Sequence, residues 1–151
     1  MTTTHPAPVE KDMPSPEVQR LWFAALRKEW SSLAVLPAHP EGSAEGVAQA
    51  LARVARLHKD EGVKVISARG ADLAQTSRLI IDMTSHVAQG GLCILVLDSV
   101  LTNPAGIPLA LAADAALLCV ELGETDSDSA KRTVELVGNS RFVGAVTLPG
   151  I

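Results

Sequence analysis

At 151 residues, the chain has the usual length of one domain and can bury enough surface to form one hydrophobic core. Its net charge of −4 disfavours nucleic acid as a partner, because a polyanion is attracted by a basic surface. The apolar runs fall short of the roughly 20 residues that span a bilayer, and the N-terminus lacks the basic and apolar regions of a secretory signal. We therefore expect a cytoplasmic protein.

The N-terminal part of the chain divides into a tail and a helix. Residues 1–15 are polar, contain several prolines and have no periodicity, which predicts a flexible tail. Ser15 is then a candidate N-cap, with Pro16 at the first helical position, and the pattern predicts a helix that continues to about Trp30. We expect residues 16–151 to form a single α/β domain.

Five short apolar runs follow, separated by polar turns and segments of mainly helical spacing. The runs are residues 32–37, 63–67, 92–98, 115–121 and 142–148. Strands that alternate with helices are typical of a parallel sheet, because parallel neighbours need a long crossover. The sequence therefore predicts a three-layer αβα domain with a mostly parallel five-stranded sheet, similar to the Rossmann and P-loop nucleotide-binding folds. The run 92–98 suits the centre of this sheet. The residues expected to be buried include Ile94, Val96, Leu118 and Val120.

Polar residues mark the expected helix starts between these strands. Ser43 and Asp72 are placed to cap the helices that follow the first two strands, because their side-chain oxygens can accept hydrogen bonds from free backbone amides. A further helix is expected from about Asp126 to Val137. These positions fix where the loops of the domain should lie.

The turns after the second, third and fourth strands are the candidate ligand sites, because parallel α/β sheets bind ligands beyond the carboxyl ends of their strands. The turn at 67–72 has the position of a phosphate-binding loop, between a strand and a helix N-terminus, and contains Arg69 and Gly70. It has a single glycine and lacks the lysine of a Walker A loop. Thr76 and Ser77 lie near the place of a magnesium-binding hydroxyl, although such residues are also common in ordinary helices.

Asp98 follows the most apolar strand, at the place where a Walker B aspartate would hold magnesium. An aspartate at a strand end also often caps the next turn, so both roles stay open. The two cysteines, Cys93 and Cys119, lie in separate apolar runs and are expected to behave as buried hydrophobic residues. The four histidines are dispersed. We therefore expect neither a metal site nor a catalytic residue.

The order of motifs along the C-terminal part of the chain resembles a known family. An apolar strand ends in aspartate (LVLDSVL), a loop and short helix lead to an Ala-Asp step and a second strand (LALAADAALLCVELGET), and a last strand closes the domain (RFVGAVTL). This order resembles the bacterial tyrosine kinases of capsule and exopolysaccharide synthesis, which belong to the MinD/ParA class of P-loop ATPases. The resemblance covers about residues 63–150. In one alignment VISARGADLAQTSRLIIDMTSHVAQGGLCILVLD stands at the Walker A strand, loop and helix and the aspartate motif that follows them. In the other, VKVISARG matches a later strand of the kinase and the whole P-loop unit is deleted.

The resemblance implies a degenerate member of this family without kinase activity. Both alignments remove the catalytic lysine, and the chain contains no tyrosine for the family's tyrosine-rich tail. The N-terminal helix keeps Glu17 and Arg20 of the family's oligomerisation motif, but Phe23 replaces its second arginine. The candidate interaction residues on this helix are Arg20, Trp22 and Trp30. Tryptophan also commonly closes small cores, so a structural role for the two tryptophans stays open.

The expected function is protein contact in bacterial polysaccharide synthesis or export, without a bound cofactor. The resemblance implies a location peripheral to the inner membrane, an inner-membrane export component as partner, and a homo-oligomer. One alternative is a nucleotide switch that binds ATP and magnesium weakly through Arg69 and backbone amides. Another is a scaffold domain of a motility or cell-positioning system.

Overall fold

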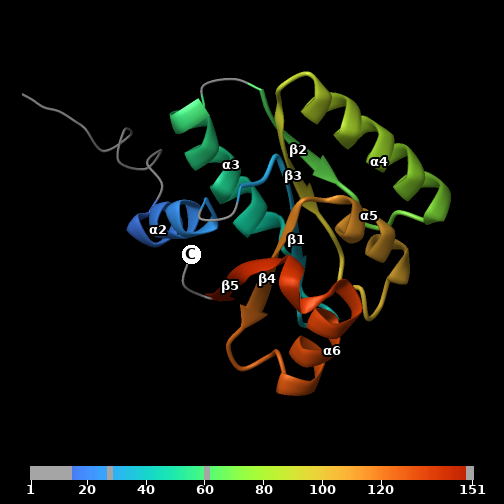
Figure 1. The fold of residues 1–151 in the computed structure, drawn as a ribbon. Coiled ribbons are helices and arrows are strands. Elements are labelled where there is room, and N and C mark those ends of the chain that lie inside the picture. The colour runs from blue at the N-terminus through green and yellow to red at the C-terminus, as the bar shows by residue number, and fades with distance from the viewer. Residues whose placement is uncertain (1–14, 27–28, 60–61, 149–151) are drawn as a thin grey trace, which may run out of the picture.

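The computed structural model describes residues 15–26, 29–59 and 62–148 (Figure 1). Residues 1–14, where a flexible tail is expected, lie outside the described residues. The first described helix, α2 (Pro16–Ala25), begins as predicted, because the Ser15 side chain accepts a hydrogen bond from the Val18 amide and Pro16 follows. The helix ends at Ala25, so the prediction that it continues to Trp30 is wrong.

The remaining elements alternate as the apolar runs predict. In chain order they are β1 (Ser32–Pro37), α3 (Glu45–Lys59), β2 (Val63–Ser67), α4 (Leu73–Ala88), β3 (Leu92–Val96), the 3-10 turn η1 (Pro104–Gly106), α5 (Ile107–Ala112), β4 (Ala115–Glu121), α6 (Ser127–Val137), the 3-10 turn η2 (Asn139–Arg141) and β5 (Phe142–Leu148). The five strands form one all-parallel sheet in the order β2-β3-β1-β4-β5.

The central strand of the sheet is β1, and not the run at 92–98. Both neighbours of β1 pair with it in parallel, and all six of its residues are buried. The run at 92–98 forms β3, which lies beside β1 and ends as a strand at Val96. Both runs are apolar throughout, so their composition does not distinguish a central strand from its neighbour.

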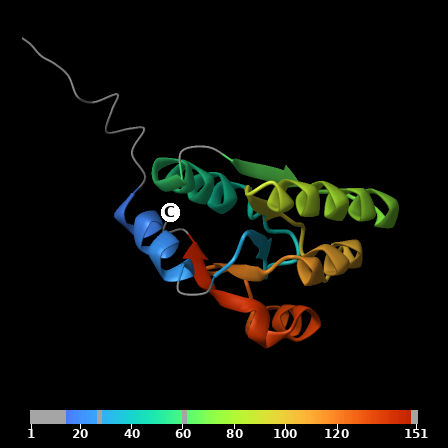
Figure 2. The same ribbon diagram turned by 45° about the horizontal axis from the view of Figure 1, so that its top comes forward.

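Helices cover both faces of the sheet, which gives the predicted three-layer αβα architecture (Figure 2). Helices α2 and α3 pack on one face against alternate strand residues such as Leu33 and Ile94. Helices α4, α5 and α6 pack on the other face against the intervening residues, such as Ala34 and Leu95. Of the strand residues predicted to be buried, Ile94, Val96 and Leu118 are buried, whereas Val120 near the end of β4 is only half-buried.

Candidate functional site

The carboxyl edge of the sheet carries the candidate site, because ligands of this fold class bind where neighbouring strands send their chains to opposite faces. Helix α3, which follows β1, lies on one face of the sheet. Helices α5 and α6, which follow the neighbouring strands β3 and β4, lie on the other. The loop after β1, residues 38–44, therefore lies at the switch point, together with the ends of β3 and β4.

Three residues predicted to bind a nucleotide, Arg69, Gly70 and Asp98, contact one another. Oδ2 of Asp98 accepts a hydrogen bond from the Gly70 amide at 2.7 Å, and Oδ1 lies 3.6 Å from Nε of Arg69. Gly70 has a positive φ of 71°, which favours glycine in this turn. Asp98 therefore ties the turn after β2 to the end of β3 and forms a half-exposed ion pair with the arginine of that turn.

The N-terminus of α4 is already capped by the chain itself. Asp72 accepts a hydrogen bond from the Gln75 amide at 2.8 Å, and the Gln75 side chain accepts one from the Asp72 amide at 2.9 Å, which is a capping box. A carboxylate thus occupies the end of the helix dipole where an anion would bind. The prediction that Asp72 begins this helix is confirmed.

The two hydroxyl residues of α4 lie in different surroundings. Thr76 is buried, and its Oγ1 has no hydrogen-bond partner among the described residues. Ser77 is exposed on the outer side of the helix. The two hydroxyls therefore do not form a shared pair of metal ligands.

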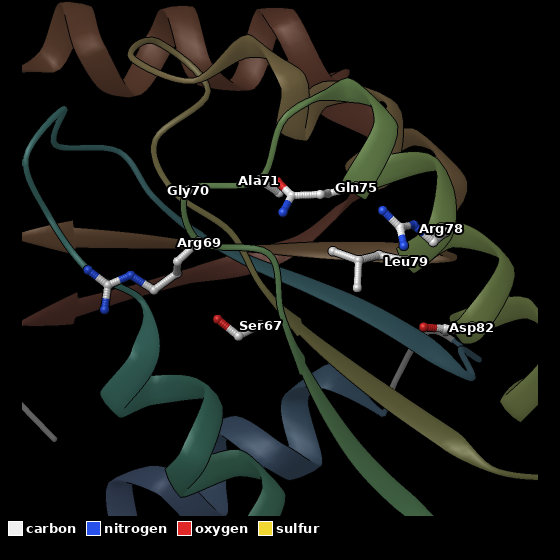
Figure 3. A pocket seen from close by; sticks show the side chains of 8 residues that line it. All are labelled: Ser67, Arg69, Gly70, Ala71, Gln75, Arg78, Leu79 and Asp82. Atoms are coloured by element: carbon white, nitrogen blue, oxygen red, sulfur yellow. The ribbon is translucent and has the colours of Figure 1, made fainter.

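A hollow of about 360 Å³ lies along the turn after β2 and the side of α4 (Figure 3). It is lined by Ser67, Arg69, Gly70, Ala71, Gln75, Arg78, Leu79 and Asp82. Sequence reasoning missed Arg78 as a lining residue, although its spacing from Gln75 and Asp82 places the three on one side of a helix. Figure 3 shows the Arg69 side chain extending away from Arg78, so the two guanidinium groups do not converge on one anion.

Sequence reasoning also missed the loop at the switch point after β1 as a candidate ligand site, because it considered only the turns after the later strands. A Cβ added at Gly42 would lie 3.2 Å from Cβ of Pro37 and 3.3 Å from Oε1 of Glu121, so the loop packs closely against the end of β4. His39 lies 3.9 Å from a carboxylate oxygen of Glu124. Residues 38–44 contain no lysine or arginine, and these glutamates make the surroundings acidic. The signal available from the sequence was that this loop, like the later turns, lies between a predicted strand and a predicted helix.

The tryptophans predicted as interaction residues are part of the core. Trp22 is fully buried, packs edge-to-face with Trp30 at 5.8 Å, and stacks with His58 at 6.4 Å. Trp30 is also buried, and its Nε1 donates a hydrogen bond to the Ala25 carbonyl at 3.1 Å. Of the two roles that the sequence left open for these residues, their burial supports the structural one, because they close the core between α2 and α3.

The outer side of α2 carries Arg20 and Phe23. Arg20 is exposed and lies 3.7 Å from Glu17 of the same helix. Phe23 is 53% exposed and contacts His58 of α3 edge-to-face at 5.3 Å. The accessible aromatic residue of this helix is thus Phe23, the residue next to the one that was predicted.

The described residues contain no candidate metal site. They contain no group of three or more His, Cys, Asp or Glu side chains that could hold a metal ion. Cys93 and Cys119 are buried free thiols, and burial raises the pKa of Cys119 to about 12. Within the same part of the chain, no helix is long and apolar enough to cross a membrane.

Neither models of known protein families nor curated proteins match this chain.

Proposed function

We propose that this chain is a non-catalytic relative of nucleotide-binding α/β proteins and acts by contacting another protein. The observation that carries the proposal is the pairing of Asp98 with the Gly70 amide and Arg69. The carboxylate expected to hold magnesium accepts the Gly70 amide and forms an ion pair with the cation expected to hold phosphate. Ligand binding at this turn would have to break contacts that already exist within the chain.

The charges around the carboxyl edge support the same proposal. Asp72 occupies the N-terminus of α4, and the loop at the switch point is packed against Glu121. A triphosphate there would face carboxylates and lack the lysine of a P-loop. One missing charge-assisted hydrogen bond alone costs about 1.5–3 kcal/mol, or roughly one to two decades of affinity.

A surface suited to protein contact lies over α2 and α3, which run side by side on one face of the sheet (Figures 1 and 2). We call it the α2–α3 patch and define it as Phe23, Leu26, Leu57 and His58. Its three apolar side chains are 53%, 41% and 58% exposed, and the ring contact between Phe23 and His58 joins the two helices. Arg20 lies three residues before Phe23 and borders the patch. Exposed apolar side chains bordered by arginine are typical of protein interfaces.

The resemblance to the capsule and exopolysaccharide kinases suggests the system in which this contact takes place. We place the protein in bacterial polysaccharide synthesis or export, peripheral to the inner membrane, with an inner-membrane export component as its partner. The placement rests on the order of motifs in residues 63–150, and the contact role rests on the site described above.

The absence of nucleotide function is tested by titrating the purified chain with ATP and GTP in the presence of magnesium. Calorimetry should detect no binding, and a phosphate-release assay should detect no turnover, in both the native chain and Asp98→Ala. Micromolar affinity that disappears in Asp98→Ala would replace the contact proposal by a nucleotide switch.

The contact itself is tested by co-expression with the polysaccharide export membrane protein encoded nearest to this chain in its genome. Phe23→Glu should abolish co-purification, because it places a charge in the centre of the α2–α3 patch. Ile81→Glu is the matched control, since Ile81 is 66% exposed on α4, on the opposite face of the sheet. Equal loss in both variants would show that the patch is not the contact surface.

A further inference from the structure

Strand β5 forms an open edge of the sheet. It pairs with β4 on one side, and among the described residues no strand pairs with its other side (Figure 1). None of its seven residues is fully buried, whereas every residue of β1 and β3 is. An edge strand presents a row of unpaired amides and carbonyls that another strand can bind.

The two edges of the sheet differ in how they are protected. The opposite edge strand, β2, is five residues long and carries the exposed Lys64, and a short strand with a lysine discourages pairing. Strand β5 has seven residues, FVGAVTL, and no charged side chain. Short length and an exposed lysine thus protect β2 and are missing at β5, whose pairing with β4 is irregular only at its start, where a register shift leaves Val143 between the partners of Ala116 and Leu117.

The backbone direction of β5 identifies the groups that are free to pair. The Leu148 carbonyl accepts a hydrogen bond from the Leu122 amide, so Leu148 directs its backbone groups toward β4. Because these directions alternate along a strand, Val146 and Gly144 also face β4, and Ala145 and Thr147 face outward. The outward groups are therefore centred on Ala145, and its exposed, small side chain allows a neighbour to approach.

We propose that two copies of this chain pair through β5 as antiparallel strands, with the two-fold axis at Ala145. In this register Ala145 lies opposite its own copy and Gly144 lies opposite Val146, both within the regular part of β5 that follows the register shift. Each opposing pair is small, apolar or β-branched, and pairs of apolar or β-branched residues stabilise neighbouring strands. No charge meets a like charge along the seam, so the strand is complementary to itself.

The helices beside β5 are compatible with this pairing. Antiparallel pairing at an edge places the two-fold axis perpendicular to the sheet, so the two copies of α6 lie on the same face. Helix α6 carries Asp128 and Glu135 together with Lys131 and Arg132, and thus brings no net charge to the seam. A hollow of about 390 Å³ between α6 and β5, lined in part by Val134 and Ala145, lies beside the seam. The second copy would cover it.

A second copy fits this edge better than an extended peptide of another protein. The two-fold arrangement pairs the same outward groups of both chains at once, which is the usual form of a homodimer interface. A foreign strand would have to match an uncharged edge that provides no charged group for selecting it. The dimer does not depend on nucleotide binding, so it stands or falls independently of the proposed function.

Sedimentation of the full chain without nucleotide tests the proposal. The native protein should sediment at twice the 15.8 kDa mass of one chain. Ala145→Lys should give a monomer, because it places two lysines opposite each other at the axis, where like charges destabilise pairing. Ser67→Lys is the matched control, since Ser67 is exposed on the opposite edge strand, and it should stay dimeric.

Hydrogen exchange gives a second measurement at the same residues. The Ala145 and Thr147 amides should become protected as the protein concentration rises through the dimerisation range, and exchange at Val146 should already be slow in the monomer. If circular dichroism shows that Ala145→Lys does not fold, Thr147→Lys is used as the lysine variant instead. A native chain that stays monomeric up to about 1 mM, where even a weak complex would form, would overturn the proposal. A folded lysine variant that stays dimeric would overturn it as well.

Discussion

Replacing Asp98 by alanine should destabilise the protein, because this carboxylate holds the turn after β2 to the end of β3. It accepts the Gly70 amide at 2.7 Å and lies 3.6 Å from Arg69, and its side chain is 27% exposed. A hydrogen bond to a charged group is worth about 1.5–3 kcal/mol, and a partly exposed ion pair adds about 0–1 kcal/mol. Water can replace part of the lost contacts at this exposure. We therefore expect a loss of about 1–2 kcal/mol in the free energy of unfolding.

Thermal and urea unfolding measure this loss directly. For a domain of this size the melting temperature should fall by about 2–8 °C in Asp98→Ala, at roughly 2–4 °C for each kcal/mol. Asp98→Asn keeps an acceptor for the Gly70 amide and loses only the charge, so its loss should be less than half as large. Asp82→Ala is the control, because Asp82 is exposed on α4 and its removal should change stability by no more than about 0.5 kcal/mol.

The outcome separates a structural from a ligand-binding role of Asp98. An Asp98→Ala protein as stable as the native chain would refute the role of Asp98 in holding the turn after β2 to the end of β3. A double-mutant cycle with Arg69→Ala should give a coupling energy below about 1 kcal/mol, because the arginine is half-exposed. A larger coupling would mean that the ion pair, and not the hydrogen bond to Gly70, holds the turn.

Three further predictions follow from the core and the helix caps. Trp22→Ala should cost about 3–5 kcal/mol in urea unfolding because the side chain is fully buried, whereas Phe23→Ala, at a half-exposed site, should cost less than about 1 kcal/mol. Burial raises the pKa of Cys119 to about 12, so a thiol reagent at pH 8 should label it only as fast as the protein unfolds; rapid labelling of the native state would contradict its burial. Hydrogen bonds from Ser129 hold the pKa of Asp126 below its usual value of 3.8, so this cap stabilises the fold above that pH and is lost as the pH falls through the lowered pKa. Between the usual and the lowered pKa, the free energy of unfolding should fall less steeply with decreasing pH in Asp126→Asn than in the native chain. An unchanged slope would show that Asp126 does not contribute to the pH dependence of stability.

The sequence by itself determined the class of fold and most element boundaries. The apolar runs at 32–37, 63–67, 115–121 and 142–148 became strands with those bounds, because a continuous apolar run between polar turns has few other ways to be buried in a parallel sheet. The starts of α2, α4 and α6 were also readable, since a cap depends only on a side chain and an amide three residues away.

Only the tertiary structure decided strand order, and with it the candidate site. The hydrogen bond between Asp98 and Gly70 joins residues 28 apart, and it exists because β2 and β3 are neighbours, which no local pattern specifies. The same is true of the central position of β1 and of the open edge at β5. Trp22 and Phe23 are adjacent in a helix of known start, yet which of them is buried depends on where α3 packs. Local spacing fixes the elements, whereas contacts between elements distant in the chain decide which of their residues are free to bind.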